Sequence, residues 1–442
     1  MAFWDELDRF GGAPALVGED GAVTSYAALA AAADRWAAGL GPGRQLVFLL
    51  CENTAPTVTA YLGCLRARHV PLLLDARLRR ALLDGLVAAY QPQAVVTPDG
   101  AIEPRPAPPV TLHADLALLL TTSGTTGSPK LVRLAARNLD ANAAGIVATL
   151  GITAADRPIT SLPLHYSYGL SVLHSHLAAG AATVLTGRSV LERAFFACAD
   201  RTTATSLAGV PYTYQLLDRL GFFAAYSHPS LVTFTQAGGK LAPDLARAVA
   251  AHCAAHGRRF FTMYGQTEAA PRMACLPAER ALDKLGSVGW PLPGGSVSLD
   301  DGELVYRGPN VMLGYATARA DLARGDDCHG VLRTGDRATI DADGAVTITG
   351  RSARFLKITG QRLSLDEIEA ALNSSGVTVA AVGGDDRLVL VTTDAAAADG
   401  LRRAVRRRFG IHPAHVEVHA VGALPLDSRG KVRYTELQEA FG

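Results

Sequence analysis

The sequence lacks the cysteine patterns of disulfide-stabilised or zinc-binding proteins. Its 442 residues include 6 cysteines, which are scattered along the chain with no closely spaced pair. Structural zinc sites and the disulfide frameworks of secreted domains both depend on such pairs. The sequence therefore predicts reduced thiols and a cytoplasmic protein.

A hydrophobic run long enough to cross a membrane is also missing. A spanning helix needs about 20 consecutive apolar residues, whereas Arg, Asp or His interrupts every long alanine- and leucine-rich segment here. Residues 1–8 are acidic and lack the basic and apolar regions of a signal peptide. We expect a soluble globular protein with no membrane partner.

The chain has no excess of one charge. Its 42 Lys and Arg residues and 41 Asp and Glu residues give a formal net charge of +1. Such a balance gives no general attraction for nucleic acid or for an anionic membrane surface, so neither is expected as a partner. The length of 442 residues exceeds what one hydrophobic core supports, which predicts at least two domains.

Strands and helices alternate along most of the chain. Apolar periodicity predicts a helix within residues 24–40, with Ser25 as its N-cap, and short buried strands around a helix that ends near Arg66. This alternation is typical of a parallel sheet with helices on its faces. Short strands with turn signals follow after Gly302, and we place a domain boundary between residues 349 and 350. The strands are predicted at 45–51, 70–74, 159–162, 182–185, 204–207, 231–236 and 260–263.

The most informative stretch follows a predicted buried strand at 116–120. It is rich in glycine and hydroxyl side chains and ends in Lys130. Glycines let main-chain N–H groups approach phosphate oxygens, hydroxyls donate hydrogen bonds, and the lysine adds a positive charge. The P-loop of kinases is excluded, because Pro129 precedes Lys130 and Leu131 follows it. The predicted phosphate contacts are Thr122, Ser123, Gly124, Thr125, Thr126, Gly127 and Lys130.

The string TSGTTGSPK, residues 122–130, resembles the phosphate-binding signature of the adenylate-forming (AMP-binding) enzymes. These include acyl- and aryl-CoA synthetases, the adenylation domains of peptide synthetases, and luciferases. The resemblance implies an α/β fold with a large N-terminal adenylation domain of doubly wound mixed sheets (1–349) and a small, mobile α+β C-terminal domain (350–442). It also implies ATP and Mg²⁺ as cofactors.

Further motifs carry the same resemblance. The segment YGQTE, residues 264–268, is similar to the family's YGxTE motif. The similarity implies that Tyr264 stacks on adenine, that Thr267 contacts the α-phosphate and that Glu268 holds the metal ion. The other nucleotide contacts implied by the resemblance are Gly238 and Gly239 on the second face of adenine, and Asp336 and Arg351 at the ribose.

Near the C-terminus, residues 424–431 resemble the family's PxxxxGK motif. The resemblance implies that Lys431 bridges the substrate carboxylate and the α-phosphate. A cation suits this place, because adenylation brings two anions together. Arg354 stands at the hinge position, where relatives have Asp or Lys, and Gly360 matches a glycine that lines the tunnel for the pantetheine thiol. Whether Arg354 changes the rotation of the small domain is left open.

Residues 161–171 resemble the family's motif at the acid pocket. Peptide-synthetase domains place there an aspartate that pairs with the α-ammonium group. This chain has Ser167 instead, with no Asp or Glu between Asp156 and Glu192. A buried ammonium needs a paired charge, so an α-amino acid is disfavoured. Arg272 can reach a second anionic group of the substrate or form a structural salt bridge, and both remain open. The expected pocket residues are Tyr166, Ser167, Tyr168, Ser171, Met263, Pro271 and Arg272.

We therefore expect an ATP- and Mg²⁺-dependent acid–thiol ligase. It would form acyl-AMP and pyrophosphate from a carboxylic acid and then pass the acyl group to CoA or to the phosphopantetheine of a carrier protein, with both acceptors left open. The alternatives are an enzyme that uses an amine or another nucleophile, a stand-alone adenylation enzyme like those of peptide synthetases, and a non-catalytic nucleotide-binding relative. The last is disfavoured because Lys130, Glu268 and Lys431 are all present. The sequence predicts neither the acid nor the oligomeric state.

Overall fold

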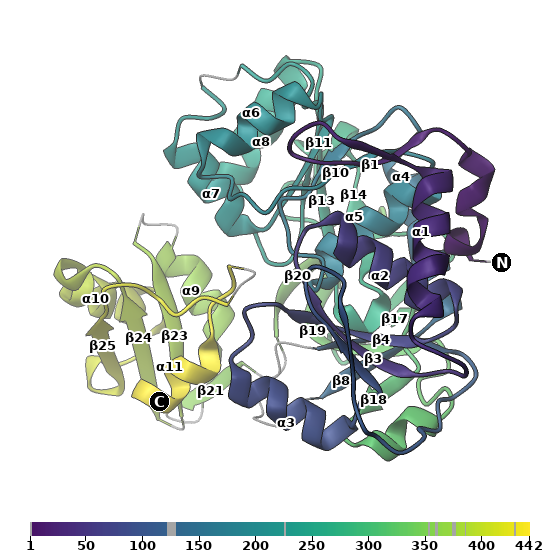
Figure 1. Cartoon of the computed structure of the whole chain (residues 1–442). Coiled ribbons are helices and arrows are strands. Elements are labelled where there is room, and N and C mark those ends of the chain that lie inside the picture. Colours follow the sequence, from purple (N-terminus) through teal and green to yellow (C-terminus); the bar gives the residue numbers. More distant parts are fainter. Residues whose placement is uncertain are drawn as a thin grey trace.

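The computed structural model describes residues 2–121, 130–224, 227–351, 354–358, 361–373, 377–384, 386–427 and 430–442. Figure 1 shows a large lobe, formed by the chain up to strand β20 (Val346–Arg351), and a small lobe formed by the rest. This architecture confirms the predicted fold class. The predicted boundary between residues 349 and 350 falls within β20 and stays a prediction. Within the described ranges, no helix has the length and apolar character needed to cross a bilayer.

The first sheet of the large lobe has the strand order β15-β14-β13-β12-β11-β9-β10-β1-β2. The strands from β13 through β1 in this order run parallel, whereas β2, β14 and β15 are antiparallel to their neighbours. The strands are β1 (Pro14–Val17), β2 (Val23–Ser25), β9 (Pro158–Ile159), β10 (Thr183–Val184), β11 (Ser206–Gly209), β12 (Thr233–Gln236), β13 (Arg259–Gly265), β14 (Arg272–Leu276) and β15 (Trp290–Pro291).

The second sheet has the order β18-β8-β7-β4-β3-β5-β6, with β3, β4, β5 and β7 parallel and the other strands antiparallel. Side chains alternate along β3: Val47 and Leu49 join one buried cluster, and Leu46 and Phe48 join another on the opposite face. Both faces are therefore covered. The strands are β3 (Leu46–Cys51), β4 (Val70–Asp75), β5 (Ala94–Val96), β6 (Ile102–Pro104), β7 (Leu116–Thr121), β8 (Leu131–Ala135) and β18 (Gly314–Ala316).

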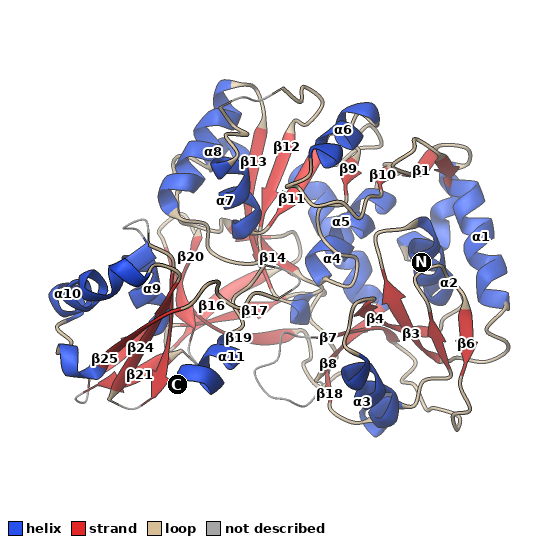
Figure 2. Cartoon of the chain, turned by 60° about the vertical axis from the view of Figure 1, so that its left-hand side comes forward, coloured by secondary structure: helices blue, strands red, loops and turns tan. Residues whose placement is uncertain are grey.

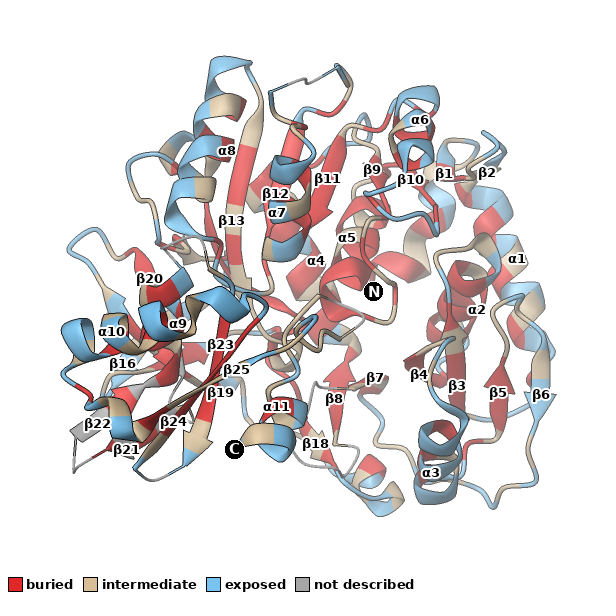
Figure 3. Ribbon diagram, turned by 90° about the vertical axis from the view of Figure 1, so that its left-hand side faces the viewer, coloured by how far each residue is buried: buried red, intermediate tan, exposed pale blue. Residues whose placement is uncertain are grey.

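Helices cover the two sheets in layers. Side chains of α1, α2, α4 and α5 share one core with residues of both sheets, α6, α7 and α8 pack on the first sheet from the other side, and α3 packs on the second. Figure 2 shows α4 and α5 between the sheets, and Figure 3 shows that they are largely buried while α8 presents an exposed outer face. The helices are α1 (Tyr26–Ala38), α2 (Ala55–Arg66), α3 (Arg80–Tyr90), α4 (Ala136–Leu150), α5 (Ser167–Ala178), α6 (Arg193–Arg201), α7 (Pro211–Arg219) and α8 (Pro243–Ala255).

A third, antiparallel sheet of order β16-β17-β19-β20 completes the large lobe. The small lobe has its own buried clusters, formed by two small sheets and three helices in the described part of the chain. The third sheet contains β16 (Ser296–Asp300), β17 (Glu303–Arg307), β19 (Val331–Ile340) and β20. The small lobe contains β21 (Phe355–Ile358), β22 (Gln361–Ser364), α9 (Leu365–Asn373), β23 (Val379–Gly384), β24 (Arg387–Thr392), α10 (Ala398–Phe409), β25 (Val416–Ala420) and α11 (Tyr434–Phe441).

Candidate active site

Two parallel neighbours, β12 and β13, end at the same edge of the first sheet. The glycine-rich segment 236–240 begins at the last residue of β12, and the segment 264–268 spans the end of β13 and the start of a short 3-10 helix, Thr267–Ala269. In α/β folds, ligands bind outside the carboxyl ends of parallel strands. The structure thus brings the two predicted nucleotide segments together at a place suited to a ligand.

Two glycines at this edge have no space for a side chain. Gly238 has a φ of +84°, and a Cβ there would lie 2.6 Å from the hydroxyl oxygen of Tyr166. At Gly265, next to a bulge between β13 and β14, a Cβ would lie 1.9 Å from the carbonyl oxygen of Pro271. Glycine is required at both positions, because a larger residue would displace the backbone or its neighbours.

Tyr264, Gln266 and Asp336 form a hydrogen-bonded group beside the strand ends. The Tyr264 hydroxyl donates to Oδ2 of Asp336 at 2.5 Å, and Nε2 of Gln266 donates to the same oxygen at 2.8 Å. Gln266 also donates to the carbonyl of Thr334 at 2.8 Å. Asp336 is only 3% exposed, so these two donors fix a buried carboxylate. Its backbone pairs in register with that of Arg351, the other predicted ribose contact.

A second group joins Glu268, Tyr315 and Lys130. The Tyr315 hydroxyl donates to Oε1 of Glu268 at 2.8 Å, and Nζ of Lys130 lies 3.3 Å from the centroid of the Tyr315 ring. Burial, and then the neighbouring Glu268, raise the pKa of Tyr315, so its hydroxyl stays a neutral donor. The other predicted phosphate contacts, Thr122, Ser123, Gly124, Thr125, Thr126 and Gly127, lie outside the described residues.

Glu268 suits a magnesium ion that is shared with phosphate groups. Its Oε1 accepts the hydrogen bond from Tyr315, and its Oε2 has no hydrogen-bond partner in the described part of the chain. Mg²⁺ is usually held by one or two carboxylates together with the phosphates of a substrate. Among the described residues, no group of three His, Cys, Asp or Glu side chains could enclose a metal ion without such a substrate.

Lys431 reaches the same edge of the sheet from the small lobe. It ends a tight turn in which its N–H donates to Oδ1 of Asp427 at 2.9 Å and its carbonyl accepts from the Asp427 N–H at 2.8 Å. Nζ of Lys431 lies 5.9 Å from the centroid of the Tyr166 ring, and its Cε lies 3.7 Å from where a Cβ on Gly238 would be. Segments far apart in the sequence therefore meet at one site.

Ser167 connects the acid-pocket motif with the nucleotide motif. Its hydroxyl oxygen lies 3.0 Å from Oγ1 of Thr267. The next residue, Tyr168, is buried, with its hydroxyl 2.8 Å from Oγ1 of Thr235 and its ring packed edge-on against Tyr166 at 6.1 Å. The position that holds an aspartate in peptide-synthetase domains thus presents a hydroxyl next to Thr267.

Of the other predicted pocket residues, Ser171, Met263 and Arg272 lie near Tyr168. Ser171 donates to the Tyr168 carbonyl at 2.7 Å, and Met263 belongs to the same buried cluster as Tyr168. The carbonyl of Pro271 accepts from the backbone N–H of Gln266 at 2.9 Å. The Arg272 guanidinium lies 4.8 Å from the Tyr168 ring and forms no salt bridge with any residue that the structure describes. The structural salt bridge considered for Arg272 is therefore not formed within that part of the chain.

Arg354 lies away from this site, inside the small lobe. Its Nη2 donates to Oε1 of Glu369 at 2.7 Å and to the carbonyl of Ala381 at 2.7 Å. Its guanidinium lies 3.7 Å from the centroid of the Tyr434 ring. The predicted hinge residue is thus anchored to α9, β23 and α11. Gly360, predicted for the thiol tunnel, lies outside the described residues.

Sequence reasoning missed three polar residues that support the site, namely Gln266, Tyr315 and Asn310. Nδ2 of Asn310 donates to the carbonyls of Ala269 at 2.6 Å and Arg272 at 3.0 Å, and so shapes the turn after Glu268. Gln266 occupies the variable position of its motif, and the other two lie in no motif. Only their place in the fold identifies them.

Comparisons with known proteins agree with this geometry. The sequence model of one family, described as AMP-binding enzyme, matches residues 3–111 and 99–316. The chain is 31% identical to a sulfoacetate–CoA ligase of Cupriavidus necator, covering 91% of this chain and 88% of that one. It is 27% identical to a feruloyl-CoA synthase of an Amycolatopsis species, covering 92% and 90%. The crystal structure of ATP-bound MatB from Rhodopseudomonas palustris shares the fold, with a TM-score of 0.82 at 23% identity over 100% of this chain and 99% of that one.

Proposed function

The chain belongs to the AMP-binding enzyme family, and from this premise we propose that it is an ATP- and Mg²⁺-dependent ligase that joins a carboxylic acid to the thiol of CoA. Its relatives named above are a CoA ligase and a CoA synthase, which favours CoA as the acceptor. The observation that carries the proposal is the position of Lys431, whose side chain lies beside Gly238 and the Tyr166 ring at the edge of the sheet where β12 and β13 end. The phosphopantetheine of a carrier protein has the same thiol and stays the alternative acceptor.

In the first step, an oxygen of the substrate carboxylate attacks the α-phosphorus of ATP. The bond from this phosphorus to the bridging oxygen breaks, and pyrophosphate leaves with that oxygen. Lys431 places a positive charge where the two anions approach each other, and the hydroxyls of Thr267 and Ser167, 3.0 Å apart, donate hydrogen bonds to the reacting groups. These three residues lower the electrostatic barrier to the attack.

Other residues hold the nucleotide for this attack. Asp336, fixed by Tyr264 and Gln266, accepts hydrogen bonds from the ribose hydroxyls, and Lys130 neutralises part of the triphosphate charge. Glu268 would hold Mg²⁺, and the bound ion would supply positive charge to the phosphate groups. Positioning two reactants in this way converts a bimolecular reaction into a unimolecular one.

In the second step, the thiolate attacks the carbonyl carbon of acyl-AMP, and AMP leaves as the thioester forms. We propose that the small lobe rotates between the steps, so that Lys431 withdraws and another surface of the lobe faces the thiol. The assignments of Arg354 to the hinge and of Gly360 to the thiol tunnel stay predictions. The scattered cysteines favour the cytoplasm, where ATP and CoA are available.

Pyrophosphate release with a panel of acids tests this function. Each acid is supplied with ATP and Mg²⁺, with and without CoA, and the products are separated by mass. Release with acids that lack an α-amino group, together with formation of an acyl-CoA, is expected. Release with α-amino acids alone would contradict the interpretation of Ser167, and an acyl-AMP that reacts with amines but not with CoA would favour the amine-using alternative. Absence of release with every acid would favour the non-catalytic alternative.

A further inference from the structure

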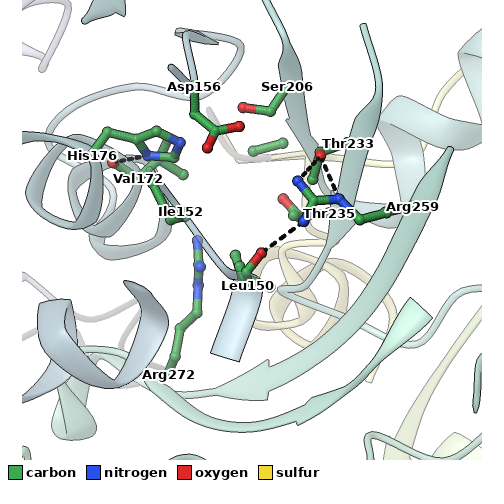
Figure 4. Close-up of a pocket in the computed structure, with 11 residues that line it drawn as sticks. Leu150, Ile152, Asp156, Val172, His176, Ser206, Thr233, Thr235, Arg259 and Arg272 are labelled. Atoms are coloured by element: carbon green, nitrogen blue, oxygen red, sulfur yellow. Dashed lines mark hydrogen bonds between the residues drawn. The ribbon is translucent and has the colours of Figure 1, made fainter. Parts of the chain in front are cut away.

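A small cavity lies next to the acid pocket, between helix α5 and strands β11, β12 and β14. Figure 4 shows the side chains that line it. Thr235 and Ala208 line its wall, and each stands directly before the last residue of its strand, where the active-site edge begins. His176 and Arg272 line the opposite side. The cavity therefore begins one residue inside the edge that carries the proposed active site.

Arg272 carries a buried charge into this cavity. Its side chain comes from β14 and points toward the cavity in Figure 4, and the residue is 3% exposed. Two of its nitrogens, Nε and Nη2, are buried and have no hydrogen-bond partner within the described residues. The ring of Tyr168, whose centroid lies 4.8 Å from Cζ of Arg272, stabilises the positive charge through a cation–π contact. A buried guanidinium without an acceptor is unfavourable, so this arrangement indicates a missing anionic partner.

The other two charged side chains that line the cavity, Arg259 and Asp156, already have hydrogen-bond partners. Arg259 donates from Nη1 to the carbonyl of Leu150 at 3.0 Å and from Nη2 to Oγ1 of Thr233 at 2.8 Å. Asp156 accepts at Oδ2 from the N–H of Thr153 at 2.8 Å.

His176 does not compete with Arg272 for an anion. Its Nδ1 lies 2.8 Å from the carbonyl of Val172, so this nitrogen carries a proton and donates. Burial lowers the pKa of His176 to about 4, so the ring is neutral at pH 7. Arg272 is the one cation lining the cavity, within the described chain, whose guanidinium has unpartnered nitrogens.

We propose that Arg272 binds a second oxyanion of the substrate, so that the enzyme activates acids bearing a distal carboxylate or sulfonate. This inference rests on the proposed function and specifies its substrate class. The reacting carboxylate lies near Thr267, Ser167 and Lys431, and the body of the acid extends along Tyr168 toward the cavity. The second oxyanion accepts hydrogen bonds from Nε and Nη2 of Arg272, a paired geometry that arginine favours with carboxylates.

Matched pairs of acids test the proposal through the kcat/KM of pyrophosphate release. Butyrate is compared with succinate, pentanoate with glutarate and hexanoate with adipate, and 3-sulfopropanoate replaces succinate in a sulfonate arm. One hydrogen bond to a charged group changes affinity by about 10- to 150-fold. The doubly charged member of at least one pair is therefore expected to be preferred by about 100-fold. The lengths of the best substrates report how far the two anionic groups lie apart.

The variant R272M keeps a long side chain and removes the charge. The preference, measured as the ratio of kcat/KM for the two members of the best pair, should fall by about 100-fold, and R272K should retain part of it. D156N serves as the control, because this carboxylate lies in the same cavity with its own partner. It should leave the ratio unchanged.

Three results would overturn the assignment. They are equal rates for both members of every pair in the wild-type enzyme, an unchanged ratio in R272M, and a ratio lost in D156N as strongly as in R272M. If R272M does not fold, the kcat/KM ratios of R272K and of the wild-type enzyme still test the assignment. Pyrophosphate release with singly charged acids only would contradict this inference and leave the proposed function intact. The absence of pyrophosphate release with every acid would instead count against the proposed function.

Discussion

Replacing Lys431 with alanine should slow formation of acyl-AMP by about 10²–10³-fold while ATP binding stays largely unchanged. The ammonium group stands at the edge of a half-buried site, with its nitrogen 5.9 Å from the Tyr166 ring. For two unit charges about 4 Å apart in such surroundings, where the effective dielectric constant is about 20, the interaction is about 4 kcal/mol. Removal of one preorganised donor from an oxyanion site costs about 2.7–4 kcal/mol. Both values correspond to a rate loss of about 10²–10³.

The assay separates the two half-reactions. Pyrophosphate release reports adenylation, binding of a fluorescent ATP analogue reports the nucleotide site, and acyl-CoA formation from chemically prepared acyl-AMP reports thiol transfer. Lys240→Ala is the matched control, since this exposed lysine is the last residue of the segment 236–240 and its Nζ points to the carbonyl of Ile348, 3.5 Å away. Its variant should keep the wild-type rate. Full adenylation by Lys431→Ala, or an equal loss in Lys240→Ala, would refute the reasoning.

Three further predictions test the ribose group, the small lobe and the pH dependence of stability. Tyr264→Phe removes one of the two hydrogen-bond donors that fix Asp336, so the KM for ATP should rise by about 10-fold or more while the KM for the acid stays constant. An unchanged KM for ATP in steady-state kinetics would count against the assignment of Asp336 to the ribose. Arg354→Met leaves Glu369 without its charge partner, and thermal unfolding should show a loss of stability of about 2–3 kcal/mol. This loss is smaller than the about 3–5 kcal/mol of a fully buried pair, because both residues keep some exposure. Stability equal to that of Arg402→Met, the control at an exposed ion pair, would contradict this prediction. Burial lowers the pKa of His174 from its usual 6.5 to about 3. Below pH 6.5 the unfolded chain therefore binds a proton that the folded chain does not. The free energy of unfolding should fall with decreasing pH by up to about 1.4 kcal/mol per pH unit. His174→Gln should reduce this slope in urea denaturation between pH 7 and pH 5, and an unchanged slope would exclude His174 as its source.

Local patterns in the sequence predicted much of the fold. The helix expected within residues 24–40 is α1, and Oγ of Ser25 accepts from the N–H of Ala28 as its N-cap. The strand expected at 116–120 is β7. The predicted lengths of two strands were wrong. The segments expected at 159–162 and 182–185 form only the two-residue strands β9 and β10, because hydrophobic side chains bury equally well in a loop beneath helices.

For the candidate site as well, the sequence identified some residues and missed others. Residues within recognisable motifs, such as Gly238 and Lys431, were found from the sequence and lie next to one another in the fold. Tyr315 and Asn310 were not found, because they contact Glu268 and Ala269 from segments distant in sequence. The unpartnered buried charge of Arg272 was likewise invisible, since burial and hydrogen-bond partners depend on tertiary packing.

The turn that presents Lys431 has a consequence for the order of catalytic events. This turn packs on the large lobe through Gly430, where a Cβ would lie 3.4 Å from Cβ of Tyr212 and 3.5 Å from Cγ2 of Val210. While that packing lasts, we expect the turn to keep a bulky thiol away from the acyl carbon. Kinetic measurements should accordingly show ping-pong behaviour, in which the first product departs before the last substrate arrives.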